Sequence, residues 1–262
     1  MIGDFLRGIS YVPRGFGLLT EPGLRRFVVL PIAINIVVFA GLFWLGAEYY
    51  QALLDWLLPR ASEIDIGGWL GDALTVAVVI LRWLLWPLFV LAGAVLMFYT
   101  FTAVANLVGS PFNGMLSARV EHRATGHMPP EVAAGGLVVE TATAVTDELR
   151  KIGHFALLGA PLLLLFFIPV INVIAPLAWA VYGAWIIALE YSDYPLGNHG
   201  LRFADQRILI RRRRLLHLGL GAGLLAMTII PVLNLLVMPT GVIAATLLRS
   251  DLREYRLEEA AV

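Results

Sequence analysis

Residues 168–176 read IPVINVIAP, and residues 230–239 read IPVLNLLVMP. In both stretches an asparagine follows the first proline by three residues, and a second proline follows within five more. Each stretch interrupts an apolar segment, about 155–190 for the first and 215–248 for the second. Because proline removes a helix hydrogen bond and disfavours helical backbone in the residue before it, each stretch is predicted to be a turn between two helices.

The helices beside these turns are predicted to be short. Each has about 14–16 residues, or roughly 21–24 Å, whereas the hydrocarbon core of a membrane is about 30 Å thick. The flanks are basic, with Arg150 and Lys151 before the first segment and a cluster at 202–214 between the two. Hairpins that enter from the cytoplasm and return to it fit both facts. We therefore predict two re-entrant hairpins that form an internal repeat, at 155–191 and 215–250, with two pairs of short spans as the alternative.

The composition places the chain in a membrane. Of its 262 residues 59% are hydrophobic and 15% are charged, whereas soluble proteins have about 45–50% and about 25%. A soluble chain with this composition would lack the polar surface to cover its core. Cysteine is absent, which excludes disulfides, thiol catalysis and iron–sulfur clusters.

Two long apolar stretches precede the hairpins. Residues 27–47 contain no charged side chain, and at 1.5 Å per residue they cover about 30 Å. They predict a first transmembrane helix within 21–58. The second stretch opens with Trp83 and Trp86, which are typical interfacial anchors. It predicts a second transmembrane helix within 73–108.

Two further helical regions are predicted outside these spans. Residues 1–20 place apolar side chains at roughly helical spacing, interrupted by four glycines and Pro13, and predict a short amphipathic helix in the membrane interface. Residues 110–154 predict cytoplasmic helices. Ser110-Pro111 is typical of a helix start there, and Gly126 of a helix end.

The distribution of charge predicts the orientation. The loop at 48–82 carries five acidic residues against Arg60 and Arg82, whereas arginines precede the first span and follow the second. By the positive-inside rule both termini are cytoplasmic, and the loop at 48–82 is external.

One short segment combines the features of an anion site: Gly23, Leu24, Arg25 and Arg26. Thr20 and Pro22 predict that a helix begins there. The free N–H groups of its first turn and the helix dipole favour an anion. Gly23 leaves room for an oxyanion to approach the backbone, and two guanidinium groups suit a tetrahedral dianion. The alternative is that both arginines only anchor the span.

Several strings resemble the bacterial CysZ family of sulfate transporters. EPGLRRFVVLP at 21–31 resembles the N-terminal signature of that family, as does Ala105-Asn106 followed by SPFNGML at 110–116. YSDYP at 191–195 and the second proline–asparagine turn are similar to family motifs too. The resemblance runs in order from about residue 10 to residue 256.

This resemblance implies an inner-membrane, multi-pass protein that admits sulfate for cysteine biosynthesis. It also implies two true spans, two hemi-penetrating hairpins, and dimers or higher homo-oligomers. In the family the Pro-Gly-x-Arg-Arg segment binds sulfate, and all of its positions are present here, at residues 22–26. The resemblance therefore favours an anion site at this segment over the alternative that Arg25 and Arg26 only anchor the span.

Other charged and glycine-rich motifs have simpler interpretations. The run Arg211–Arg214 is typical of contact with the head groups of anionic membrane lipids, with an anion-gathering vestibule as the alternative. Glu121, Glu190 and Asp193 are expected to form interfacial ion pairs. The spacing of Gly219 and Gly223 is a helix-packing pattern. No nucleic-acid partner, metal or cofactor is expected, because the corresponding motifs are missing.

The sequence thus predicts an all-α integral membrane protein with two transmembrane helices, two re-entrant hairpins and amphipathic cytoplasmic helices. The predicted function is that of a sulfate permease or channel that is not an enzyme. The alternative is a non-transporting structural or assembly protein whose arginines bind lipid. A membrane-embedded enzyme is the third hypothesis, and it is disfavoured because the sequence shows no nucleophile with a matching base.

Overall fold

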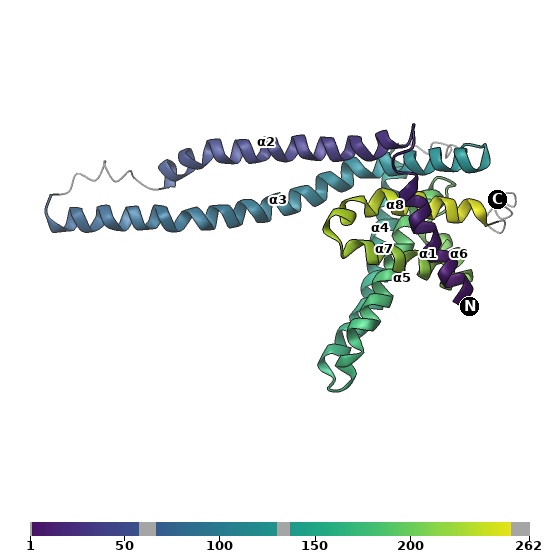
Figure 1. Ribbon diagram of the computed structural model, residues 1–262. Coiled ribbons are helices and arrows are strands. Elements are labelled where there is room, and N and C mark those ends of the chain that lie inside the picture. The colour runs from purple at the N-terminus through teal and green to yellow at the C-terminus, as the bar shows by residue number, and fades with distance from the viewer. Residues whose placement is uncertain (1, 58–66, 130–136, 253–262) are drawn as a thin grey trace. The chain divides into compact units, whose positions relative to one another are not determined.

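A computed structural model describes residues 2–57, 67–129 and 137–252. In these residues every regular element is a helix, as the sequence predicts (Figure 1). The α-helices are α1 (Ile2–Gly17), α2 (Arg25–Leu57), α3 (Trp69–Thr125), α4 (Leu137–Leu164), α5 (Ala175–Gly197), α6 (Phe203–Arg212), α7 (Arg214–Thr228) and α8 (Pro231–Asp251). Two short 3₁₀ helices, η2 (Leu165–Phe167) and η3 (Ile171–Val173), lie between α4 and α5.

Four segments of the described chain are long and apolar enough to cross a membrane: Arg25–Trp56, Trp69–Val95, Thr146–Phe167 and Pro231–Asp251. Large apolar side chains on the first two are exposed, including Val37 at 71% and Trp83 at 78%. Side chains of this kind need lipid around them. The chain is therefore a multi-pass membrane protein.

The chain divides into two compact units. One unit is Val29–Ser110, which contains most of α2 and the first part of α3. Within it the guanidinium of Arg82 bonds Asp55 at 3.0 Å, and the rings of Tyr50 and Phe89 lie 4.4 Å apart. These two contacts link α2 to α3. The other unit consists of Met1–Val28 and Pro111–Val262.

In the second unit α1 packs on α7 and α8 through glycines. A Cβ at Gly8 would overlap the carbonyl oxygen of Leu216, and one at Gly219 would overlap that of Phe5. A Cβ at Gly223 would lie 2.8 Å from the side chain of Val12. The helix-packing interpretation of Gly219 and Gly223 is confirmed, and the partner is α1. Neither the glycines nor Pro13 interrupt α1. At Gly8 the helix meets α7, and at Gly15 it meets α8.

The first proline–asparagine stretch is a turn, as predicted. Helix α4 ends at Leu164, the 3₁₀ helices follow, and α5 begins at Ala175. Val170 has a φ of 71°, and the N–H of Asn172 donates to the carbonyl of Ile168 at 3.0 Å. Helices α4 and α5 then lie side by side as a hairpin (Figure 1).

The second stretch is a turn only at its start. The break lies at Ile229 and Ile230, and Pro231 is the first residue of α8, where its missing N–H has no cost. Helix α8 then continues through Asn234 and Pro239 to 21 residues. The prediction of a turn up to the second proline, with an arm of about 14–16 residues after it, is wrong here. Nearly every residue of α8 beyond Val237 is buried, and this packing offsets the hydrogen bond that Pro239 removes.

The predicted helix start at Ser110-Pro111 is also wrong. Helix α3 runs without interruption from Trp69 to Thr125, and proline is better tolerated inside membrane helices because neighbouring groups satisfy the freed carbonyl. The predicted end at Gly126 is confirmed. Gly126 has a φ of 81°, and its N–H donates to the carbonyl of His122 at 2.8 Å.

Candidate functional site

The candidate anion segment lies immediately before α2. Helix α2 begins at Arg25 and not near Thr20, so the predicted start is about five residues too early. The cause is Gly23, whose φ of 92° is incompatible with a right-handed helix. The N–H groups of Leu24 and Arg25 both donate to the carbonyl of Glu21, at 3.1 and 3.2 Å. A tight turn therefore leads into the helix.

Leu24 holds this turn in place. Its side chain is buried, and it packs with Phe27 and Val28 in a cluster that also contains residues of α3 and α8, namely Leu116, Val120, Val242 and Ile243. Its N–H is used by Glu21, so the prediction that Leu24 offers a free N–H to an anion is wrong. Leu24 is an anchor for the segment.

Gly23, Arg25 and Arg26 keep donors for which the described part of the chain provides no acceptor. All three residues are exposed. Among the described residues neither arginine forms an ion pair, and the N–H groups of Gly23 and Arg26 have no hydrogen-bond acceptor. The guanidinium of Arg26 lies 4.9 Å from the ring centre of Phe27. The turn thus carries two guanidinium groups and two N–H groups available to an acceptor.

The acidic residue of the same turn is paired elsewhere. The carboxylate of Glu21 accepts from the guanidinium of Arg123 in α3 at 2.8 Å. This pairing fixes the turn to the end of α3. It also keeps the carboxylate from neutralising Arg25 or Arg26.

A buried cluster of charge lies at the ends of α3, α5 and α8. One carboxylate oxygen of Glu121 is 2.8 Å from Nε2 of His199 and 2.9 Å from Nη1 of Arg249, and the Glu121 side chain is 7% exposed. One turn away, the hydroxyls of Ser117 and Thr246 lie 2.9 Å apart. Burial raises the pKa of Glu121, but the hydrogen bond from His199 and the charge of Arg249 outweigh it, so the pKa lies below its ordinary value. The expectation that Glu121 forms an ion pair is confirmed.

A second cluster surrounds Lys151 of α4. Its ammonium lies 2.7 Å from Asp193, 3.1 Å from Glu148 and 3.7 Å from Glu190. Gln206 also donates to Asp193 at 2.7 Å. The expected ion pairs of Glu190 and Asp193 are confirmed, but the central role of Lys151 was missed. The sequence does single this residue out, because Lys151 is the one lysine in a chain with 18 arginines.

Together these features describe an all-helical, multi-pass membrane protein with an exposed pair of arginines at a helix start. Its described residues contain no group of His, Asp or Glu side chains able to hold a metal ion.

Comparison with known proteins places the chain in a family. The family model described as Sulfate transporter CysZ/Etoposide-induced protein 2.4 matches residues 11–239. A protein named Sulfate transporter CysZ from Pseudomonas fluorescens is 37% identical over 248 residues, which cover 94% of each chain. One of the same name from Pseudomonas syringae pv. tomato is 37% identical over 243 residues, which cover 92% of this chain and 91% of that one. The chain belongs to this family, which is one of transporters and not of enzymes.

Proposed function

We propose that this chain is an inner-membrane sulfate permease or channel that supplies sulfate for assimilation and cysteine biosynthesis. The observation that carries the proposal is the pair of exposed guanidinium groups, Arg25 and Arg26, which have no carboxylate partner among the described residues. The names of its relatives support sulfate as the substrate. The alternative, a structural protein whose arginines only hold lipid, would need no such pair at this turn.

The chemistry of the turn suits a tetrahedral dianion. The N–H groups of Gly23 and Arg26 lie at the positive end of α2, where the helix dipole favours negative charge. Each guanidinium can donate two parallel hydrogen bonds to a pair of sulfate oxygens. Apart from the two chain neighbours of Gly23, no described residue has an atom within 4 Å of the position that a Cβ on Gly23 would take. The anion can therefore approach the backbone there.

The experiment is sulfate binding and uptake by a variant that keeps the charge. We expect Arg25→Lys with Arg26→Lys to insert in the membrane as the parent does, because the positive-inside signal is retained. Charge-assisted hydrogen bonds contribute about 1.5–3 kcal/mol each, so removal of both arginines by Arg25→Ala with Arg26→Ala should weaken binding at least about a hundredfold. Isothermal titration with sulfate, and with chloride and phosphate as competitors, measures the affinity. Sulfate flux into proteoliposomes measures transport.

The matched control is Arg211→Lys with Arg212→Lys, which makes the same exchange in another exposed basic stretch. It should bind and transport as the parent does. If the Arg25 and Arg26 lysine variant behaves like this control, the pair is only an anchor. If the alanine variant inserts and still binds normally, the anion site lies elsewhere.

We further infer that the α4–α5 and α7–α8 hairpins are re-entrant. Between Lys151 and Glu190, and again between Arg214 and Arg249, there is no Asp, Glu, Lys or Arg. The tips expose large apolar side chains, including Val170 at 85%. A tip that emerged on the far side of the membrane would place these side chains in water. Helix α7, with 15 residues, is about 22 Å long and too short to cross alone.

The same proposal includes the orientation and the assembly. Both termini are cytoplasmic, since arginines flank the spans on the side of the termini. The acidic region 48–82 is not a loop as predicted, because it includes the end of α2 and the start of α3, and the connection between these two helices is external. The chain assembles into dimers or higher homo-oligomers, as the sequence resemblance implies. Membrane lipids are its other partners.

A further inference from the structure

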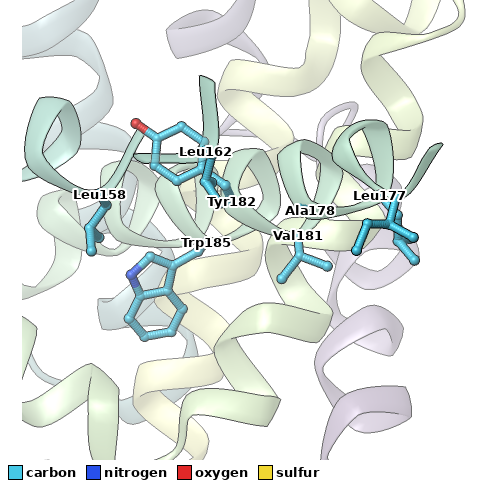
Figure 2. Close-up of a pocket in the computed structure, with 8 residues that line it drawn as sticks. Leu158, Leu162, Leu177, Ala178, Val181, Tyr182 and Trp185 are labelled. Atoms are coloured by element: carbon cyan, nitrogen blue, oxygen red, sulfur yellow. The ribbon is translucent and has the colours of Figure 1, made fainter. Parts of the chain in front are cut away.

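An apolar groove of about 670 Å³ runs along the α4–α5 hairpin. One wall is Leu158 and Leu162 of α4, and the other includes Val181 and Trp185 of α5. Figure 2 shows Val181 and Trp185 projecting from the same side of α5. The groove borders Thr146–Phe167, a candidate membrane span. Its volume lies in the range of pockets that hold small organic ligands.

The groove has little polar character of its own. The hydroxyl of Tyr182 donates to the carbonyl of Phe155 at 2.7 Å, so this donor is already satisfied. The remaining lining is almost entirely hydrocarbon. An occupant of the groove must therefore be a hydrocarbon chain or an apolar surface.

Basic side chains lie next to the Leu158 end of the groove, one helical turn beyond its lining, and this region is called the basic end. His154, Leu158 and Leu162 are spaced by four residues on α4, so they follow one face of the helix and continue the groove wall into His154. Nη1 of Arg207, on α6, donates to Nδ1 of His154 at 3.2 Å. Arg211 lies one turn further along α6, close enough for its charge to act on the same imidazole.

This positive charge is not neutralised within the described part of the chain. Neither Arg207 nor Arg211 forms an ion pair with a described carboxylate. Because Nδ1 of His154 accepts from Arg207, Nε2 carries the proton when the ring is neutral. That N–H and the Nε–H of Arg207 have no acceptor among the described residues. These two N–H groups are buried, and the basic end thus holds positive charge that suits an anion.

We propose that this groove is a specific binding site for an acidic phospholipid of the cytoplasmic leaflet. The phosphate bonds Arg207 and Arg211, and one acyl chain lies between α4 and α5 from Leu158 towards Leu177. An amphiphile with an anionic head matches both the apolar groove and its basic end. The helix face of a second copy would fill the groove but leave the two arginines without a counter-charge. The proposal does not depend on sulfate transport.

The test is native mass spectrometry of the purified full chain with dioleoyl phosphatidylglycerol or dioleoyl phosphatidylcholine. The parent should bind the acidic lipid at least about tenfold more tightly, since each basic residue near a lipid surface adds to the attraction. Arg207→Gln with Arg211→Gln should abolish this preference. Ala178→Phe, which fills the groove, should weaken binding of both lipids.

Two matched controls separate a site from general attraction to lipid. Arg212→Gln with Arg214→Gln removes the same charge nearby and should keep the preference. Leu163→Phe enlarges an exposed residue outside the groove and should leave binding unchanged. The proposal is overturned if the Arg207 and Arg211 variant retains the preference, or if Ala178→Phe binds as the parent does. It is also overturned if Val181→Cys, in this Cys-free chain, cross-links to a second copy by oxidation.

Discussion

Gly23 is the residue that shapes the candidate anion site. Its φ of 92° lies in the left-handed region, which costs a residue with a Cβ about 1–2 kcal/mol. No atom within 4 Å would contact that Cβ, so the backbone conformation alone requires glycine. The sequence predicted room for an anion at Gly23, but a single residue's φ cannot be derived from composition and spacing. The start of α2 was therefore placed too early.

At this residue we expect Gly23→Ala to lower stability by about 1–2 kcal/mol, and Gly23→Asn by less, because asparagine tolerates the left-handed region. The thermal midpoint of the detergent-solubilised protein measures the loss. Gly153→Ala is the matched control, since Gly153 lies in helix α4 with open space around it and should gain up to about 1 kcal/mol. Equal midpoints for Gly23→Ala and the parent would contradict the strain argument.

The buried carboxylate of Glu121 predicts a large effect of a nearly isosteric change. Glu121→Gln removes the charge that faces Arg249, which is 2.9 Å away. Loss of one partner of a buried ion pair costs about 3–5 kcal/mol. Arg249→Met should cost a similar amount, and the double variant should cost clearly less than the sum of the two. Thermal midpoints of the four proteins give the coupling, and simple additivity would show that the pair is not energetically linked.

The same carboxylate predicts a pH dependence. The pKa of Glu121 in the folded protein lies below its ordinary value of 4.5. Its ionisation therefore adds stability that is fully present above about pH 4.5 and is lost as the pH falls through the folded pKa. The gap between the thermal midpoints of the parent and Glu121→Gln should therefore narrow as the pH falls below about 4.5. A gap that widens as the pH falls below that value would mean that the pKa is shifted the other way.

At the level of helices, apolar runs and prolines predicted the elements better than their ends. The spans and the turn at 168–176 follow from length and from the hydrogen bond that proline lacks. Helix continuation through Pro239 could not be predicted, because it depends on packing against parts of the chain that are distant in sequence. The docking of α1 through Gly8 was missed for the same reason. Local propensity is a weak guide where such contacts decide.

The hairpins give a prediction of their own at this scale. Asn172→Cys places a single thiol at the first turn of a Cys-free chain, and Asn234→Cys places one in the first turn of α8, next to the break at Ile229 and Ile230. Both positions are exposed in the protein. If the turns lie in lipid, a bulky impermeant thiol reagent added outside the cell should label neither. Labelling of both thiols after detergent solubilisation is the control for reactivity. Fast external labelling at both turns would instead make these helices ordinary spans.

For the molecule as a whole, composition and charge already defined a multi-pass membrane protein. Arg25 and Arg26 of the predicted anion segment are exposed, and their binding of sulfate stays a prediction. The cluster around Lys151 was not predicted, since its carboxylates come from α4 and α5 and meet only after the hairpin forms. Spacing along a sequence does not show which charges meet across helices.

The orientation of the whole chain is the last prediction. The 48–82 region carries five acidic residues and two arginines, while the 202–214 region carries six arginines and one aspartate. Because translocation of arginine-rich segments is disfavoured, 202–214 stays in the cytoplasm and 48–82 is exported. Asp65→Cys should therefore react with an impermeant reagent in intact cells, and Asp205→Cys only after the cells are permeabilised. The reverse labelling pattern would mean that the orientation of the whole chain is inverted and that Arg25 and Arg26 lie on the outer face of the membrane.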